Sequence, residues 1–296
     1  MPELRAARIG ARTIDVLPED LALTPRPPFT AGEGDWWTLA PDAVLLDDDA
    51  ARVVPAPYPG LVTVGTTGAG ELLLLNLARV PALLLDGNPV HITEVCTSLA
   101  LELGMSPWAG EVEVVTVGFG EDLPKLLPTA RIAHMRQAEH ALRDLGERLL
   151  EAHQLPATDH QPYLLLCASS LDPTLAWEFA DVIDKAGPVR VTLVAPASAA
   201  AAHFPEAEIL NVSQDTPQPL DTVGSAITLQ RLDHASYVQV TTALKVSGEP
   251  AHPAQGPWQD VPDEPEVLAE PEPSPAAEGE AVPSCQRPLD RPRWRP

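Results

Sequence analysis

The sequence predicts an α/β fold in which a mostly parallel sheet carries helices on both faces. Three observations lead to this fold class. Over residues 111–247, short β-branched or aliphatic runs alternate with longer runs of helical periodicity. Hydrophobic residues make up 45% of the 296 residues, enough for a sizeable core. Beyond Gly248 the alternation ends in a segment rich in proline and acidic residues. We therefore expect an irregular segment over 1–60, an α/β domain over 61–248 and a tail over 249–296.

The first 60 residues are predicted to be irregular and to pack against the core. One short strand is expected within residues 9–17. Many prolines follow it and prevent long elements, because proline fixes φ and lacks a backbone donor. The adjacent Trp36 and Trp37 indicate a segment that packs on the domain through large apolar rings.

Residues 61–104 are expected to form a hairpin, a short strand and a helix. Two apolar runs, 61–65 and 71–77, are separated by a glycine-rich turn, which is typical of a β-hairpin. A short apolar run at 82–85 then leads to a turn at Gly87. Residues 90–104 have helical periodicity, and Gly104 is a natural helix terminator.

From residue 111 the pattern becomes strand followed by helix. The predicted strands are 112–118, 163–168, 189–195, 208–212 and 226–232, and the predicted helices are 130–154, 173–185, 198–203 and 235–245. This alternation implies parallel strands joined by helical crossovers. We expect the strand over 226–232 to lie at an edge of the sheet.

The tail and the net charge limit the possible partners. The chain has 19 Lys and Arg against 42 Asp and Glu, a formal charge of −23, so direct binding to nucleic acid is not expected. Residues 249–281 contain nine acids and no Lys or Arg. Such a proline-rich, acidic segment buries too little apolar surface to offset its chain entropy, and we expect it to be disordered and to recruit or space a protein partner.

Targeting signals and disulfide patterns are not recognisable. The first residues lack the apolar core of a signal peptide, and no apolar stretch reaches the ~20 residues that a membrane span needs. Cys96, Cys167 and Cys285 form no CxxC pair and are interpreted as spectator thiols. We therefore expect a cytoplasmic protein without a membrane span.

Two glycine loops approach a phosphate-binding pattern. In the first, Gly65 and Gly70 have the spacing of a P-loop, but Glu71 and Leu72 stand where Lys and Ser or Thr are needed. A carboxylate there repels phosphate, so we interpret this loop as a hairpin turn. The second loop, at Gly87, follows a strand and precedes a helix, which is the usual place for bound phosphate.

The loop at Gly87 has also lost the residue types of phosphate chemistry. Ile92, Thr93 and Glu94 occupy the positions of the second glycine, the lysine and the serine. The strand over 163–166 runs into Cys167 rather than into an acid, and Asp172 comes too late to replace one. We therefore expect no cation where a triphosphate would lie, no NTP hydrolysis, no cofactor, and a protein that is not an enzyme.

Other catalytic and metal patterns are not found in the sequence. It has no Gly-x-Ser-x-Gly elbow and no HExxH motif. His134 and His140 fall on opposite sides of the predicted helix, while His153 and His160 flank a loop without supporting ligands. The acid clusters at 19–20 and 47–49 lack the spacing of a calcium loop. We therefore assign no catalytic, cofactor-binding or metal-binding residue.

The most distinctive phrases are Leu-Ala-Leu-Glu-Leu-Gly-Met-Ser-Pro-Trp-Ala over 99–109 and Val-Val-Thr-Val-Gly-Phe-Gly over 114–120. With residues 57–62 and 230–233, they resemble a module of large actinobacterial proteins that carry a LysM segment, transmembrane helices and a bacterial transcriptional activator domain. The similarity covers roughly residues 50–247. It implies a degenerate P-loop-like α/β fold, distantly similar to FtsK-type ATPase domains, in a signalling or envelope-associated assembly. This sequence shows no LysM segment, membrane span or activator domain, and a Pro/Glu-rich tail follows residue 248.

Three functional hypotheses follow. The first is a non-catalytic regulatory or scaffold module that binds protein partners. The second is a nucleotide-sensing domain, in which Gly87, Asn88 and the amides of the next helix bind a nucleotide without hydrolysing it. The third, by family analogy alone, is a component of a transcriptional regulator that needs a basic partner to contact DNA.

Overall fold

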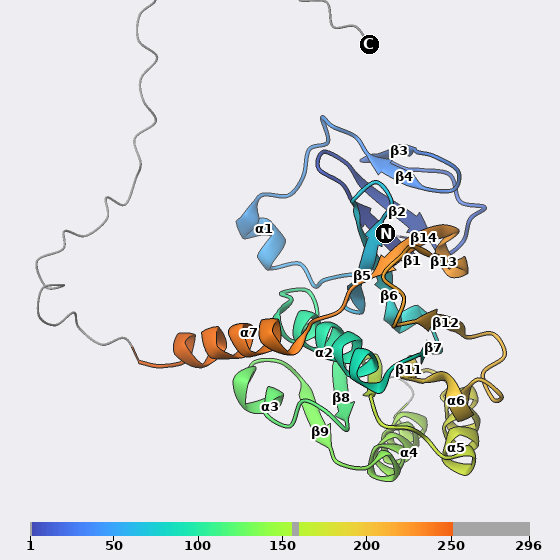
Figure 1. The fold of residues 1–296 in the computed structure, drawn as a ribbon. Helices are drawn as coiled ribbons and strands as arrows, with labels where there is room; N and C mark the ends of the chain where they lie inside the picture. Colours follow the sequence, from blue (N-terminus) through green and yellow to red (C-terminus); the bar gives the residue numbers. More distant parts are fainter. Residues whose placement is uncertain (1, 156–159, 251–296) are drawn as a thin grey trace, which may run out of the picture. The chain divides into compact units, whose positions relative to one another are not determined.

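A computed structural model describes residues 2–155 and 160–250 of the chain (Figure 1). Six parallel strands form one sheet, called here the parallel sheet, in the order β12-β7-β11-β10-β8-β9. Their bounds are Ala82–Asp86 (β7), Glu113–Val117 (β8), Ile132–Met135 (β9), Tyr163–Cys167 (β10), Val191–Pro196 (β11) and Glu208–Asn211 (β12). The central strands are buried aliphatic runs, as expected for a sheet that is covered on both faces.

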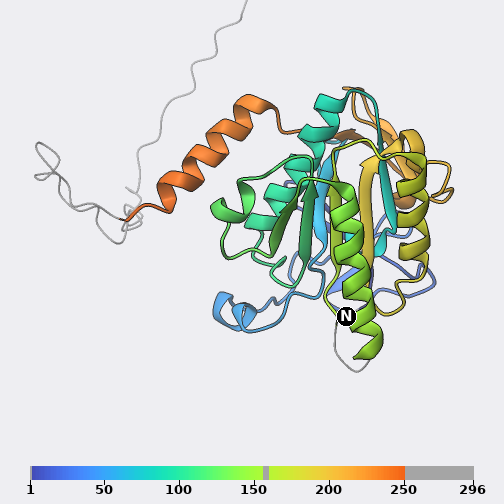
Figure 2. The ribbon, with the colours of Figure 1, turned by 90° about the horizontal axis from the view of Figure 1, so that it is seen from below.

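Helices cover both faces of the parallel sheet, so the predicted α/β class is confirmed. On one face α2 (Pro89–Met105) packs its apolar side chains against Leu83 and Leu85 of β7. On the other face α4 (Ala138–Gln154), α5 (Pro173–Asp184) and α6 (Ala197–Ala200) pack against Leu84, whose side chain points the opposite way in the pleat. Figure 2 shows α4 and α5 side by side on this face. Two further helices are α3 (Leu123–Leu126) and α7 (His234–Ser247).

A second sheet of eight strands, called here the antiparallel sheet, has the order β13-β14-β5-β6-β1-β2-β4-β3. Its strands are Leu4–Ile9 (β1), Ile14–Pro18 (β2), Phe29–Ala31 (β3), Trp37–Leu39 (β4), Leu61–Thr67 (β5), Leu72–Asn76 (β6), Gln218–Leu220 (β13) and Ser225–Leu229 (β14). Short helices η1 (Leu77–Arg79), η2 (Asp221–Val223) and α1 (Asp48–Arg52) complete the elements. The expected hairpin of β5 and β6 is present.

The N-terminal segment contains more regular structure than its prolines suggested. Residues 9–17 were expected to form one strand, but β1 and β2 pair around a tight turn in which Gly10 donates to the carbonyl of Thr13. Stretches rich in proline, such as 19–28 and 53–60, are irregular as expected. Strands β1 to β4 form because they pair with the hairpin and with one another, which is a tertiary effect invisible to local patterns.

Two other elements differ from the sequence expectations. The helix expected over 130–154 begins at Ala138, and residues 132–135 instead form β9 at the edge of the parallel sheet. The strand expected at an edge over 226–232 is β14, and it pairs antiparallel with β5 in the antiparallel sheet. Both runs are short. Periodicity alone cannot distinguish a helix from a strand over 132–135, and it cannot identify the strand with which 226–232 pairs.

The two sheets share one hydrophobic core around α2. Val62 and Leu75 of the antiparallel sheet belong to the same buried cluster as Leu83 and Leu166 of the parallel sheet. Glu102 of α2 adds a polar connection, because its Oε1 accepts hydrogen bonds from the backbone N and the Oγ1 of Thr63, both at 2.8 Å. The fold therefore fixes α2 relative to both sheets.

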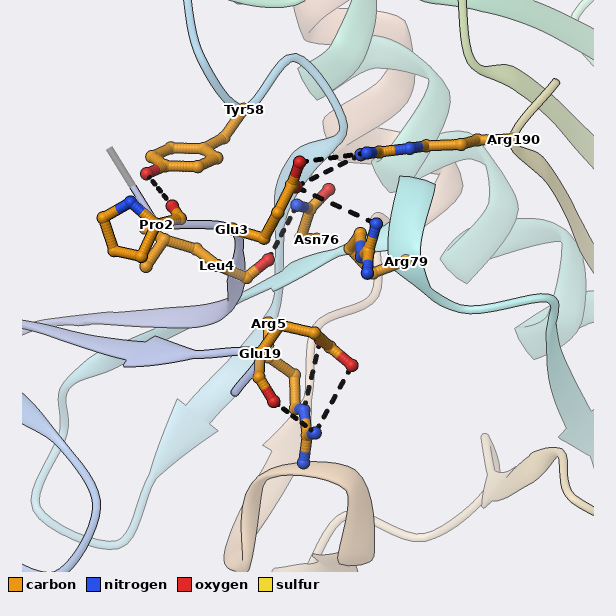
Figure 3. Close-up of polar contacts among 9 residues, drawn as sticks. All are labelled: Pro2, Glu3, Leu4, Arg5, Glu19, Tyr58, Asn76, Arg79 and Arg190. Carbon is orange, nitrogen blue, oxygen red and sulfur yellow. Dashed lines mark hydrogen bonds and ion pairs between the residues drawn. The ribbon is translucent and has the colours of Figure 1, made fainter. Parts of the chain in front are cut away.

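A polar cluster at the start of β1 also connects the sheets (Figure 3). Arg190, which precedes β11, donates to Glu3 at 3.0 and 3.3 Å, and Arg79 of η1 lies 3.9 Å from the same carboxylate. The buried side chain of Asn76 donates to the carbonyl of Leu4 at 2.8 Å. The pairing of Glu3 with Arg190 therefore holds the start of β1 next to the start of β11.

Candidate functional site

The carboxyl end of β7 is the place in this topology where a ligand site is expected. Strand β7 sends its chain to α2 on one face, while its neighbour β11 sends its chain to α6 on the other face. Adjacent strands whose connections leave in opposite directions open a crevice at their carboxyl ends. Only Gly87 and Asn88 separate β7 from α2, so the loop is short.

Glycine is required at position 87. Its φ of +127° lies in a region that L side chains rarely adopt, and a Cβ there would lie 2.6 Å from Ser213 Oγ. Asn88 then caps α2, because its side-chain oxygen accepts from the backbone N of Val90 at 2.9 Å, and Pro89 takes the first helical position. The local sequence thus ends the strand and starts the helix within two residues.

Ser213 fills the space that faces this loop. The backbone N of Asn88 donates to Ser213 Oγ at 2.9 Å, and the same hydroxyl lies 3.2 Å from His91 Nδ1. Ser213 is held in place because its own backbone N donates to the side chain of Asn211 at 3.0 Å, directly after β12. A hydroxyl from the same chain therefore binds an amide that would otherwise be free for an anion.

Arg231 brings a positive charge to the same place. Its Nη1 donates to the carbonyl of Val212 at 2.8 Å and lies 2.9 Å from His91 Nδ1, while its Nη2 pairs with the exposed carboxylate of Asp215. Because a guanidinium only donates, His91 Nδ1 is the acceptor of that contact. The expectation that no cation lies at this loop is therefore wrong. Arg231 is far from the loop in sequence, and it lies near the loop because it follows strand β14 by two residues.

The other positions of the P-loop comparison have structural roles. Ile92 is buried in the core, and Thr93 Oγ1 donates to the carbonyl of Pro89 within α2 at 3.0 Å. At the end of β10, Asp172 is the N-cap of α5 and accepts from the backbone N of Leu175 at 2.9 Å. The glycines at 65–70 belong to the hairpin of β5 and β6, as expected.

The remaining sequence candidates lie apart from this loop. His134 contacts Thr116 Oγ1 at 3.2 Å, and His153 contacts the carbonyl of Leu149 at 2.8 Å. Among residues 2–155 and 160–250 there is no group of three His, Cys, Asp or Glu side chains placed to hold a metal. Trp36 and Trp37 are buried, as predicted for packing residues. Cys285 lies outside the described residues.

The two described cysteines are buried free thiols, in agreement with the sequence interpretation. Burial raises the pKa of Cys96 well above its ordinary value, with a smaller contribution from nearby Cys167. Burial likewise raises the pKa of Cys167 to about 11. Both thiols are therefore protonated near neutral pH, which is the opposite of what a nucleophilic cysteine needs.

Comparisons with known proteins give structural similarities only. No family model matches the sequence, and no curated protein matches it. The cytoplasmic domain of EssC has a TM-score of 0.38 and 13% identity, over 64% of this chain and 49% of that chain. ATPases 2 and 3 of Thermomonospora curvata EccC, in complex with a signal sequence peptide, have a TM-score of 0.43 and 10% identity, over 62% and 42%. The chain thus spans less than half of both structures.

A third similar structure is the pCW3 conjugation coupling protein TcpA with ATPγS, with a TM-score of 0.38 and 10% identity, over 84% of this chain and 94% of that chain.

The prediction that this chain is not an enzyme is contradicted, because the EccC structures are described as ATPases. One of its premises also fails, since Arg231 places a cation 2.9 Å from His91 Nδ1 in the first turn of α2. The LysM and activator-domain family is not confirmed.

Within the described residues, no helix is long and apolar enough to cross a bilayer.

Proposed function

We propose that the chain is a regulatory or scaffold module that binds a protein partner in an envelope-associated assembly. The loop after β7 supports this proposal, because Ser213 of the same chain binds the Asn88 amide and α2 starts directly after that residue. Because a side chain of the chain itself occupies the end of β7, the loop favours a function in which the molecule binds another protein through its surface. The sequence resemblance to LysM and activator-domain proteins implies membership of such an assembly, and we propose residues 249–296 as the element that recruits or spaces the partner.

The test is purification of the tagged full chain from its native host, followed by reciprocal purification through the recovered protein. A matched variant keeps the tail length but carries Gln or Asn in place of the nine acids of residues 249–281. We expect the full chain to recover an envelope or regulatory component, and the variant to recover less of it. The proposal fails if the chain purifies alone and hydrolyses ATP at a rate that Arg231→Ala abolishes.

A nucleotide-sensing function is the second candidate, and the position of Arg231 favours it. A phosphate group at the loop would replace Ser213 Oγ as acceptor for the Asn88 amide and would compete with Asp215 for the guanidinium. His91, in the first turn of α2, lies next to both groups. Binding of an anion would then be coupled to movement of residues 212–217, which follow β12.

Thermal shift with millimolar ATP, ADP, cyclic nucleotides and inorganic phosphate separates the two candidates. A ligand that binds the folded chain and not the unfolded chain stabilises it by RT ln(1 + [L]/Kd), so the melting temperature of a sensor rises with one of these ligands. Arg231→Ala should remove that rise, while Arg148→Ala should leave it unchanged because Arg148 pairs with Glu113 near the amino ends of the strands. No shift with any of these ligands rejects this candidate.

A further inference from the structure

The connection between β4 and β5 exposes a concentrated set of large apolar side chains. Val44 is 95% exposed and Val53 80% exposed, and they are the two most exposed large hydrophobic side chains among the described residues. Leu45, Leu46 and Val54 are each more than half exposed. Figure 1 shows this segment and α1 standing away from the strands. We call residues 42–54 the arm. Scattered exposed apolar side chains are ordinary in a soluble protein, but five within one short segment are a candidate contact surface.

A groove on the antiparallel sheet has complementary properties. It has a volume of about 450 Å³, and its walls include Leu23, Phe29 and Trp37 together with several prolines. Trp37 is buried beneath it, and its ring centroid lies 6.4 Å from that of Phe29. Arg26 is the one charged residue of the lining. Within residues 2–155 and 160–250, its guanidinium has no carboxylate partner, unlike Arg5, Arg8 and Arg79.

The charges of arm and groove match. Asp42 and Asp47 flank the apolar triad 44–46 of the arm, and both carboxylates are exposed. The groove offers apolar walls and the cation Arg26. An apolar segment with carboxylates on both sides therefore fits a groove with aromatic walls and one cation at its rim. The same chain carries both halves of this complementary pair.

The backbone directs the arm away from the groove of its own chain. Ala40 still pairs with the groove wall, because its backbone N donates to the carbonyl of Pro28 at 3.1 Å. A turn follows at once, in which the backbone N of Ala43 donates to the carbonyl of Ala40 at 3.0 Å. The arm does not line the groove in this structure. The arm thus begins directly after β4, the strand that contributes Trp37 to the groove, but the arm does not run along the groove.

We propose that the occupant of the groove is the arm of a second copy of this chain, exchanged reciprocally across a twofold axis. The arm begins directly after β4, and Trp37 of β4 lies beneath the groove, so arm and groove lie close together in each copy. When the arm of one copy enters the groove of a second copy, the arm of the second copy therefore lies near the groove of the first. A twofold axis then repeats the same contact, which closes the dimer and covers both arms. This inference is independent of the proposed partner and of the loop at Gly87.

The test is sedimentation equilibrium and light scattering of the full chain from low to high micromolar concentration. We expect a dimer, and a halved mass for the arm variant Leu45→Asp and for the groove variant Leu23→Asp. Leu150→Asp is the matched control, because Leu150 on α4 is as exposed as Leu45 and lies outside both surfaces. Circular dichroism melting of each variant checks that the fold is retained.

Mixing the two deficient variants gives the sharpest result. A copy with an intact groove and a copy with an intact arm can form one of the two contacts, so the mixture should regain a heterodimer that neither variant forms alone. The proposal is overturned if the wild-type chain stays monomeric at high micromolar concentration. It is also overturned if Leu150→Asp dissociates the dimer equally, or if mixing restores nothing.

Discussion

Gly87 and Ser213 approach each other so closely that no side chain fits between them. A methyl group at position 87 would combine two costs, a φ of +127° and a distance of 2.6 Å to Ser213 Oγ. We expect Gly87→Ala to lower the free energy of unfolding by about 1–3 kcal/mol in urea titrations.

Gly146 provides the matched control for this substitution. It lies within α4 and has open space around its would-be Cβ. Gly146→Ala should therefore raise the free energy of unfolding by about 0.5–1 kcal/mol, because alanine loses less chain entropy in a helix. Equal effects of the two substitutions would contradict the described contact at the loop.

Cys96 and Cys167 allow a second test at the residue scale. Both side chains are fully buried, and burial raises the pKa of Cys167 to about 11, so very little thiolate exists near neutral pH. In a Cys285→Ser variant, Ellman's reagent should react slowly with the native chain and rapidly after unfolding in urea. Rapid reaction of the native variant would show that one of these thiols is accessible.

Glu102 connects α2 to the antiparallel sheet, and its removal tests a contact between elements. The carboxylate accepts from both the backbone N and the Oγ1 of buried Thr63, so Glu102→Ala leaves two donors without a partner. We expect a loss of about 1–3 kcal/mol in the free energy of unfolding. Glu102→Gln keeps an acceptor oxygen and should cost less.

Glu147→Ala is the control for this contact. Glu147 is an exposed residue on α4, and its substitution should change the free energy of unfolding by less than about 0.5 kcal/mol. A Glu102→Ala variant as stable as Glu147→Ala would show that the hydrogen bonds to Thr63 are replaced by water at no cost.

The elements that could be predicted from the sequence are those with strong local patterns. Strands such as β10 and β11 are long aliphatic runs, and α5 begins with Pro173 directly after its cap Asp172. The strand expected within 9–17 overlaps β2, but β1, β3 and β4 could not be predicted, because each is stabilised by pairing with distant residues. The element β9 is too short for periodicity to distinguish it from the start of a helix.

The candidate site follows the same division. Gly87 and its place between strand and helix are readable from local sequence. Arg231 and Ser213 reach the loop only because β12 and β14 belong to different sheets that meet near α2, and no local pattern contains that information. Because Arg231 reaches the loop through the tertiary fold and not through the local sequence, no cation was predicted at this loop.

Glu3 links the stability of the whole molecule to pH. A hydrogen bond from Arg190 holds the pKa of Glu3 below its ordinary value of 4.5, although partial desolvation opposes the shift. Folding therefore favours the ionised form, so this contribution is present above the unfolded pKa and is lost as the pH falls through the folded pKa. Since the side chain is 50% exposed, the contribution should be below about 1 kcal/mol.

Glu3→Gln measures this contribution directly. The variant should be slightly less stable than the wild-type chain at about pH 7, and this difference should be smaller at about pH 3, because Glu3 gains a proton as the pH falls through its lowered folded pKa. Urea unfolding at both pH values gives the two differences. A difference that is the same at both pH values would mean that the contact with Arg190 does not depend on the charge of Glu3.

The shared core around α2 predicts that the two sheets unfold together. Leu75 of β6 and Leu166 of β10 belong to one buried cluster, although their strands lie in different sheets. Leu75→Ala removes most of a fully buried side chain and should lower the free energy of unfolding by about 2–5 kcal/mol. If unfolding is cooperative, hydrogen exchange should then lose protection in β10 as much as in β6. Leu150→Ala, at an exposed position, should change neither strand. Loss of protection confined to β6 would instead show that the antiparallel sheet opens alone, and that α2 stays with the parallel sheet when it does.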